Sequence, residues 1–212
     1  MFPASPQAID VPLPIRTPRL LLRLKQPGDG FATSVAVQET WDELHQWMEW
    51  AEDRETHTPE LAEARITVVL SSFLRRELIE LQAIEVATGQ PVVWCGFYNL
   101  DWEARTCFIG YWARRSVHGR GLTTEAANAH VRYAFGALGM RRVCLTLSAG
   151  NEASRRIVEK LGFTYEGTDP QANTLPGGRK ADRLNYFRDS TEALPPLDVQ
   201  WGAAAGAMRM SS

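Results

Sequence analysis

The chain has 212 residues, of which 44% are hydrophobic and 23% charged, and its formal net charge is −2 at pH 7. These values are ordinary for one soluble globular domain, they argue against a general nucleic-acid binder, and no apolar run approaches the roughly 18 residues of a membrane span. The N-terminus lacks the charged and apolar regions of a secretory signal, and the three cysteines (Cys95, Cys107 and Cys144) lack metal-ligand spacing; we therefore expect no metal site, and reduced thiols in a cytoplasmic protein.

The predicted elements begin after a proline-rich N-terminal extension, residues 1–14. Residues 19–24 form a strand, and residues 31–49 have helical periodicity with Trp41, Leu44, Trp47 and Met48 on one face. A second helix begins at Thr58 as the N-cap, with a proline at its first position. This first third of the chain is therefore a strand followed by two helices.

Strands and helices alternate in the rest of the chain until a tail at residues 190–212, which has no sustained period and in which Trp201 could contact the body. The predicted strands are residues 79–87, 92–100, 107–113, 143–148, 163–166 and 182–187. The predicted helices are residues 123–138, closed by Gly139, and 151–161. This order indicates an α+β domain.

Residues 109–126 are the most informative segment, because a strand-like run with two aromatic residues leads through a basic, glycine-containing turn into a helix. Gly119 and Gly121 allow the backbone to turn tightly, so that its N–H groups and the positive end of the helix dipole can bind a phosphate. The dinucleotide fingerprint would require a third glycine where Thr124 stands, and the P-loop sequence is absent.

Further motifs accompany this loop in a fixed order. The strand at residues 143–148 leads to Asn151, to Ser154 three residues later, and to a short helix that ends in Lys-Leu-Gly-Phe. Residues 17–23 (Thr-Pro-Arg-Leu-Leu-Leu-Arg) precede them, followed by a Leu-x-x-Trp-x-x-Trp segment at residues 44–50.

Together these motifs resemble the GCN5-related N-acetyltransferase (GNAT) superfamily, in its RimJ/RimL branch of ribosomal-protein alanine/serine N-acetyltransferases. In the family's loop pattern His118 takes the place of Gln or Arg, Gly121 is the required glycine, and Thr123 falls where Gly or Ala is usual, so two of the three positions depart. The resemblance implies a domain over residues 15–189, built on a mixed central β-sheet flanked by helices. The strands at residues 107–113 and 143–148 would splay apart, and acetyl-CoA would be the co-substrate.

The resemblance also implies the roles of individual residues. Asn151 would position the thioester as well as cap its helix, and Ser154 would protonate the leaving thiolate, with Tyr165 as a second candidate for that role. The residues implied to contact the cofactor are Trp112, Ala113 and Arg114 for the pantetheine, and His118, Gly119, Arg120, Gly121, Leu122 and Thr123 for the pyrophosphate. In the loop we expect backbone amides to matter more than the side chains of Arg114, Arg115 and Arg120.

The general base is not evident from the sequence. Relatives often have a glutamate in the central strand, and Phe108 stands there in this chain; at another position that is acidic in relatives the residue is Asn173. Glu49, Glu52 and Asp101 could act through water, whereas His45 and His130 have the setting of surface or packing residues. Trp47, Trp50 and Phe108 are expected to line an apolar acceptor cleft, whereas Trp41 is expected in the core.

The sequence therefore predicts an N-acetyltransferase that acts on a primary amine, preferentially a peptide or protein N-terminal α-amine. An α-amine with a pKa of about 8 costs only ~1.4 kcal/mol to deprotonate at pH 7, against ~4.6 kcal/mol for a lysine, so it depends less on a strong base. The alternatives are an acetyltransferase of a small amine or antibiotic, and a catalytically silent acyl-CoA-binding module. No nucleic-acid or membrane partner is expected, and a homodimer stays open.

Overall fold

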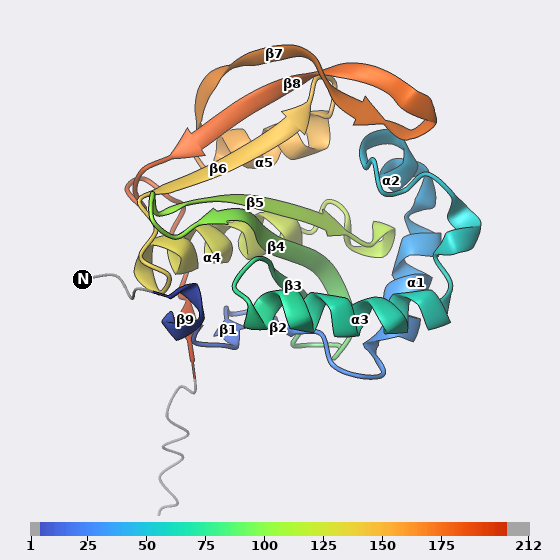
Figure 1. Ribbon diagram of the computed structural model, residues 1–212, viewed down its shortest axis with the longest axis horizontal. Helices are drawn as coiled ribbons and strands as arrows, with labels where there is room; N and C mark the ends of the chain where they lie inside the picture. The colour runs from blue at the N-terminus through green and yellow to red at the C-terminus, as the bar shows by residue number, and fades with distance from the viewer. Residues whose placement is uncertain (1–4, 203–212) are drawn as a thin grey trace, which may run out of the picture.

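A nine-stranded sheet extends through residues 5–202, the part of the chain that the computed structural model describes (Figure 1). The strand order is β7-β8-β6-β5-β4-β3-β2-β1-β9, and every neighbouring pair is antiparallel except β5 and β6, which are parallel. The strands are β1 (Ile15–Arg16), β2 (Leu20–Leu24), β3 (Ile79–Glu85), β4 (Pro91–Asp101), β5 (Thr106–Ala113), β6 (Arg142–Ser148), β7 (Thr164–Leu175), β8 (Arg179–Arg188) and β9 (Gln200–Trp201). The predicted mixed sheet is confirmed.

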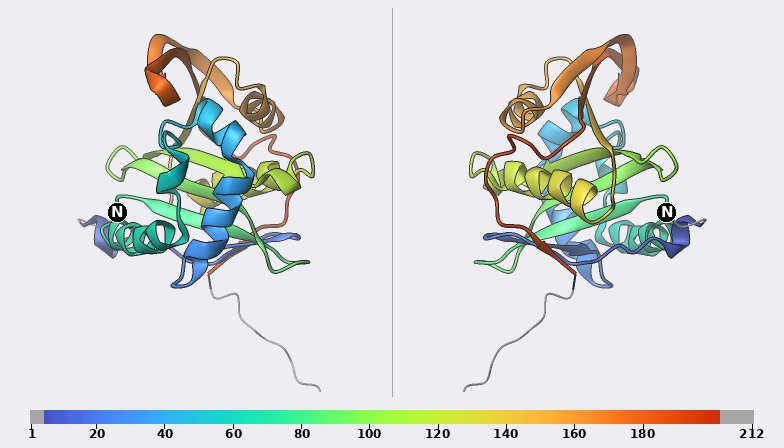
Figure 2. Two further views of the ribbon diagram at one scale, coloured as in Figure 1. Left: turned by 90° about the vertical axis from the view of Figure 1, so that its right-hand side faces the viewer. Right: turned by 90° about the vertical axis from the view of Figure 1, so that its left-hand side faces the viewer.

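Helices cover both faces of this sheet (Figure 2). On one face lie α4 (Leu122–Gly136) and α5 (Glu152–Lys160), where His130 of α4 stacks on Phe97 of β4 with the ring centroids 4.7 Å apart. On the other face lie α1 (Asp29–Glu39) and α3 (Pro59–Leu74), and here the indole of Trp94 donates to the Thr33 hydroxyl at 3.3 Å. Consecutive side chains of β4 and β5 therefore point alternately into two different layers.

The parallel pair β5 and β6 separates after three residues. Pairing runs from Thr106↔Arg142 to Phe108↔Cys144, yet β5 continues to Ala113 and β6 to Ser148. Beyond that point β6 stays paired with β8 on its other side. In Figure 1, β6, β8 and β7 diverge from β5, which confirms the predicted splay of the two central strands.

The predicted helix over residues 31–49 is wrong as a single element, because the chain breaks it at Thr40 into α1 and α2 (Trp41–Trp47). No proline or glycine marks this break. Thr40 is buried, and its hydroxyl accepts the N–H of Arg115 at 3.0 Å, while the carboxylate of Glu39 binds the guanidinium of Arg114. The break therefore depends on distant contacts that a local pattern does not contain.

The other helix ends follow their sequence signals. Thr58 caps α3 by accepting the N–H of Leu61, and Asn151 caps α5 by accepting the N–H of Ser154 at 3.1 Å. Gly139 has a φ of 66° just after α4. The hairpin strands β7 and β8 are longer than predicted, because β7 continues through a register irregularity between Asp169 and Asn173.

Parts of both terminal segments pack on the domain. Ile9 and Val11 are buried in the main core, after a short 3-10 turn η1 (Pro6–Ala8). At the other end β9 pairs with β1, and the ring of Trp201 lies against Tyr133 with centroids 5.8 Å apart. Residues 1–4 and 203–212 of the predicted extension and tail lie outside the described part. Within residues 5–202, no helix has both the length and the apolar character needed to cross a membrane.

Candidate functional site

A cleft of about 770 Å³ lies where β5 and β6 separate. Its lining comes from both layers of the domain, because the gap between the strands connects the two faces of the sheet. Ser154 and Asn151 line it from α5, Leu145–Ser148 from β6, and Trp47 and Trp50 from the segment around α2. Asn151, Ser154, Trp47 and Trp50, which the sequence placed in one site, thus lie around one cavity.

The first turn of α5 holds the two polar residues with predicted catalytic roles. Asn151 is buried, and its side-chain oxygen is bonded to the Ser154 N–H, so its amide group is free to present N–H donors to the cleft. Tyr111 of β5 lines the same region, and its hydroxyl is buried. Tyr165 is instead half-exposed on β7, where its hydroxyl bonds to Thr168 at 2.5 Å, so it is not at this site.

Tryptophan rings form the opposite wall of the cleft. Trp94 and Trp112, cross-strand neighbours in β4 and β5, stack with centroids 4.2 Å apart and an interplanar angle of 4°. Trp50 lies 6.0 Å from Trp112, and Trp47 packs over Gly150, where a Cβ would stand 3.4 Å from its ring. Trp47 therefore spans from α2 to the loop before α5, on the far side of the gap.

The predicted acceptor residue Phe108 does not line this cleft; its ring lies 5.7 Å from that of Tyr98. Phe108 points to the same face of the sheet as Trp112, as expected, but it lies in the part of β5 that is still paired with β6. The gap opens one step later, at Gly110, where a Cβ would come within 3.1 Å of the Tyr98 ring. Gly110 and Tyr98 therefore line the cleft in its place.

The charged residues of the cleft floor were not found from the sequence. Glu80 of β3 lines the cleft between Lys25, at 2.5 Å, and Arg65, at 3.4 Å. Burial alone would raise the pKa of Glu80, but the Lys25 ammonium and the Arg65 guanidinium outweigh it, and the pKa is lowered. In the sequence, Glu80 is only a polar residue at an inward position of a strand. Such residues are too common to indicate a functional site.

Next to the cleft, the glycine loop has the backbone geometry that the sequence predicted. Gly119 and Gly121 have φ values of 76° and 77°, in the left-handed region, and Gly121 is the N-cap of α4. The first N–H groups of α4 have no partner within the helix and point out of its positive end. Glu125 fixes this end to β2 by accepting from the side chain of Arg19 at 2.5 Å and its N–H at 3.1 Å.

The arginines of the loop are bound to carboxylates of neighbouring elements. Arg114 binds Glu39 at 2.6 Å, and its N–H donates to the Val92 carbonyl. Arg115 binds Glu43 at 2.6 Å and Asp42 at 3.1 Å, and Arg120 binds Glu85. The imidazole of His118 lies 3.0 Å from the Ala113 carbonyl. These four side chains are thus already bonded within the protein.

Two of the base candidates from the sequence, Asp101 and Glu52, lie outside the cleft lining, and His130 packs in the core as expected. Asp101 accepts from the Ala104 N–H in the β4–β5 turn, and Glu52 accepts from the Gly177 N–H, so neither faces the cleft. His130 is fully buried, which lowers its pKa to about 4. Asn173 does line the cleft, and its amide donates to the Ser148 hydroxyl at 2.8 Å.

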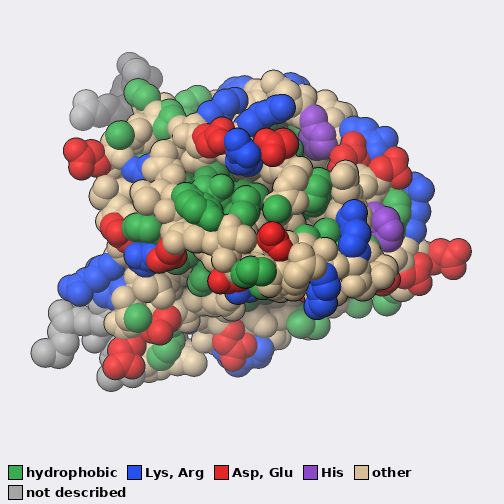
Figure 3. Space-filling view, turned by 90° about the horizontal axis from the view of Figure 1, so that it is seen from above, with side chains coloured by type: hydrophobic (Ala, Val, Ile, Leu, Met, Phe, Trp, Pro, Cys, Tyr) green, Lys and Arg blue, Asp and Glu red, His purple; other side chains and the backbone are tan. Residues whose placement is uncertain are grey.

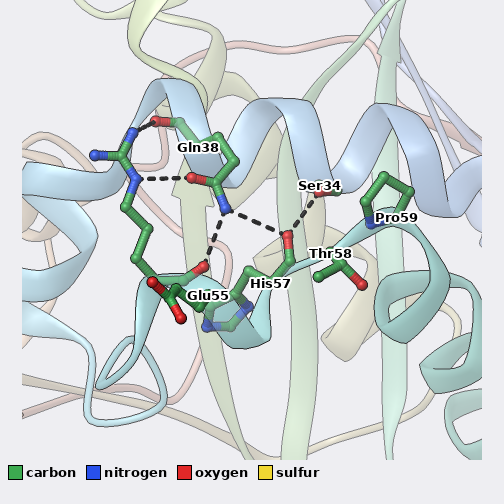
Figure 4. Close-up of a pocket in the computed structure, with 7 residues that line it drawn as sticks. Ser34, Gln38, Glu55, His57, Thr58 and Pro59 are labelled. Atoms are coloured by element: carbon green, nitrogen blue, oxygen red, sulfur yellow. Dashed lines mark hydrogen bonds between the residues drawn. The ribbon is translucent and has the colours of Figure 1, made fainter.

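A second hollow lies between α1 and residues 54–59 and is lined mostly by residues with polar side chains (Figure 4). Gln38 and Arg54 donate hydrogen bonds to each other there. The side-chain amide of Gln38 also donates to the His57 carbonyl, and the Ser34 hydroxyl donates to the same carbonyl at 2.7 Å. These bonds fasten the segment after α2 to α1, and with it Trp50, whose ring lies 5.4 Å from that of His57. We interpret this hollow as structural support for the cleft wall.

The surface of the molecule on the β7 and β8 side has a central group of hydrophobic side chains, with acidic and basic side chains around it (Figure 3). The end of this hairpin is tied to the α2 side of the cleft, because Arg179 donates to the Gln46 carbonyl at 3.0 Å and Gly177 donates to Glu52 at 3.0 Å. These two contacts hold the hairpin across the open side of the split.

Residues 19–164 match the family described as the acetyltransferase (GNAT) domain. The chain belongs to this family. A relative from Bacillus subtilis (strain 168), named "Putative ribosomal N-acetyltransferase YdaF", is 30% identical over 151 residues, which are 70% of this chain and 79% of that protein. The enzyme is accordingly an acetyl-CoA-dependent N-acetyltransferase of the GNAT type.

Two solved structures have the same fold. Mycobacterium smegmatis RimJ in complex with CoA-disulfide has a TM-score of 0.75 at 22% identity, covering 89% of this chain and 91% of that one. RimL, the ribosomal L7/L12 α-N-protein acetyltransferase, in complex with coenzyme A, has a TM-score of 0.74 at 20% identity, covering 82% and 96%. The split between β5 and β6, with the N-terminus of α4 beside it, fits a molecule with a long extended arm and a pyrophosphate.

Proposed function

We propose that this acetyltransferase modifies the α-amine at the N-terminus of a peptide or protein. The proposal rests on the lack of a free carboxylate base in the cleft, whose one histidine within residues 5–202, His57, has its ring packed against Trp41 and Trp50. Among the described residues, Glu49 and Glu80 supply the only carboxylates in its lining. Glu49 is exposed, and Glu80 is ion-paired with a lowered pKa, which makes it a weak proton acceptor.

The acceptor amine must then lose its proton with little help from a carboxylate of the cleft. At pH 7 about a tenth of an α-amine with a pKa of about 8 is neutral, against about one part in 2,500 of a lysine with a pKa of about 10.4. The α-amine thus has an advantage of roughly 200-fold before any contact with the protein is made. The names of the relatives, which refer to ribosomal and α-N-protein acetylation, agree with this choice.

We assign the binding of the cofactor and acceptor, and the protonation of the leaving thiolate, to different residues around the gap. We propose that the amide of Asn151 orients the thioester arm and that Ser154 protonates the leaving thiolate. Backbone N–H groups of residues 119–123 would bind the pyrophosphate, and Trp47 and Trp50 would line the path of the acceptor. We also propose a cytoplasmic location, which fits the free, buried thiols of Cys95, Cys107 and Cys144.

A small apolar amine is the second candidate acceptor. The observation in its favour is the aromatic wall formed by Trp50, Trp94 and Trp112, which would bury a ring or an alkyl chain. Such an amine would also need no strong base if its own pKa were low. A peptide, in contrast, must extend out of the cleft into solvent.

The test is release of free thiol from acetyl-CoA with a panel of acceptors at pH 7. The panel contains peptides with free Ser or Ala N-termini, N-blocked peptides with a lysine, and small aromatic and alkyl amines. We expect the free N-termini to give the highest kcat/KM, and the lysine peptides to gain on them as the pH rises toward 9. Faster turnover of small amines would favour the second candidate, and faster lysine acetylation at pH 7 would contradict both.

A further inference from the structure

The hydroxyl group of Tyr111 is buried beside the cleft. Tyr111 pairs with Cys95 across β4 and β5 and so points to the α4 and α5 side of the sheet, away from Trp112. Its hydroxyl is buried and has no hydrogen-bond partner of ordinary geometry within residues 5–202. An unmet buried hydroxyl is costly, and this one borders the cleft together with Ser154.

We propose that Tyr111 is a positioning residue that donates its hydroxyl hydrogen to the Oγ of Ser154 once the substrates are bound. The inference depends on the proposed role of Ser154 as proton donor. A serine hydroxyl rotates about its Cβ–Oγ bond, and its hydrogen can point in several directions. If Oγ accepts from Tyr111, the serine's own hydrogen is left to point into the cleft, toward the sulfur of the thioester.

The same bond would stabilise the charge that develops on Ser154. The amine nitrogen forms the new C–N bond, the C–S bond breaks, and its electron pair stays on sulfur, which takes the hydrogen of Ser154. The amine gives its surplus proton to water, and solvent returns a proton to Ser154 after the products leave. While Oγ carries negative charge, the Tyr111 hydroxyl is a fixed donor to it in a site with little water.

The acidity of Tyr111 suits a donor that keeps its proton. Burial raises the pKa of Tyr111, and the neighbouring Ser154 hydroxyl opposes only part of that shift. The phenol therefore stays protonated at neutral pH. The sequence did not indicate this role, because Tyr111 and Ser154 are far apart in the chain and come together only around the folded cleft.

Tyr111→Phe tests the proposal, because it removes the hydroxyl and keeps the ring. We expect kcat to fall by about 10–100-fold while the KM for acetyl-CoA stays unchanged. The matched control is Tyr133→Phe: the Tyr133 hydroxyl is also buried without a partner in the described chain, but it lies on α4 outside the cleft. This control should keep the wild-type kcat and thermal stability.

A double-mutant cycle with Ser154→Ala separates positioning from a general structural effect. If Tyr111 acts through Ser154, the Tyr111→Phe change has no further effect on kcat in the Ser154→Ala background. An unchanged kcat for Tyr111→Phe, or the same fold-loss with and without Ser154, would overturn the inference. A wild-type enzyme that acetylates none of the amine acceptors would instead refute the proposed function.

Discussion

At the scale of single residues, the proposed chemistry depends on the first turn of α5. Ser154 is half-buried and lines the cleft, and the side chain of Asn151 accepts its backbone N–H, so both residues lie at the gap between β5 and β6. An N-terminal helix position also favours negative charge, which stabilises a developing thiolate. Ser154 and Asn151 can therefore be tested separately for chemistry and for stability.

Ser154→Ala should lower kcat by about 10²–10⁴-fold, the usual contribution of a positioned acid, because it removes the hydrogen given to sulfur. The affinity for acetyl-CoA should change little, since alanine keeps the helix start. Thiol-release kinetics and calorimetry measure the two quantities. A variant with near-normal kcat would reduce Ser154 to a structural residue.

Asn151 has a capping role and a proposed binding role, which two substitutions distinguish. Asn151→Asp keeps an oxygen that accepts the Ser154 N–H, so its free energy of unfolding should stay close to wild type, whereas Asn151→Ala should lose about 0.5–2 kcal/mol. Only the aspartate variant should lose activity without losing stability, because it lacks the N–H donors. Full activity of Asn151→Asp would show that capping is its whole function.

At the scale of elements, we propose that the loop before α4 binds the phosphates of acetyl-CoA. Gly121→Asp and Gly121→Asn place side chains of the same shape at the N-cap of α4, and both residue types tolerate its left-handed φ of 77°. They differ by one negative charge. Acetyl-CoA should therefore bind about 10-fold or more weaker to the aspartate variant than to the asparagine variant in calorimetry. Equal affinities would mean that the phosphates bind elsewhere.

The elements with local signals could be predicted, and the details of the cleft could not. Helix starts at Thr58 and Asn151 and the turn at Gly121 are coded by adjacent residues, so they were found. The break at Thr40 depends on Arg115, which is 75 residues away in the sequence. The misplaced Phe108 shows the limit of pattern: alternation gives the side of the strand, but not where the neighbouring strand leaves.

The cleft residues that come from β3, β4 and β5 could not be predicted either, because a local sequence pattern does not show how strands pair. Tyr111, Trp94 and Glu80 enter the cleft only because β3, β4 and β5 are paired in one register, with Glu80 opposite Gly96 and Trp94 opposite Trp112. Without an assembled sheet, each is an ordinary inward strand residue. The family motifs indicated the glycine loop, the start of α5 and the tryptophans Trp47, Trp50 and Trp112, but not these three residues.

At the scale of the whole molecule, the buried His130 links stability to pH. Burial lowers the pKa of His130 to about 4 from about 6.5, so between these values the unfolded chain binds a proton that the folded chain does not. The contribution to stability is complete above pH 6.5 and is lost as the pH falls toward 4. From pH 7 to pH 5 this loss amounts to about 2 kcal/mol.

His130→Gln should remove that part of the pH dependence. Urea unfolding of both proteins at pH 7 and pH 5 measures it, and the other titrating groups cancel in the comparison. We expect the wild-type free energy of unfolding to fall by about 2 kcal/mol more than that of the variant. Equal losses would mean that His130 titrates alike in the folded and unfolded chains.

We propose that this GNAT enzyme acetylates α-amines because its cleft lacks a free carboxylate base. The most direct measurement uses one peptide that carries both a free Ser N-terminus and an internal lysine, incubated with the enzyme and acetyl-CoA at pH 7. Tandem mass spectrometry then locates the acetyl group. The account predicts acetylation at the N-terminus, with the lysine unmodified at early times. Acetylation of the lysine at an equal or greater rate would contradict it.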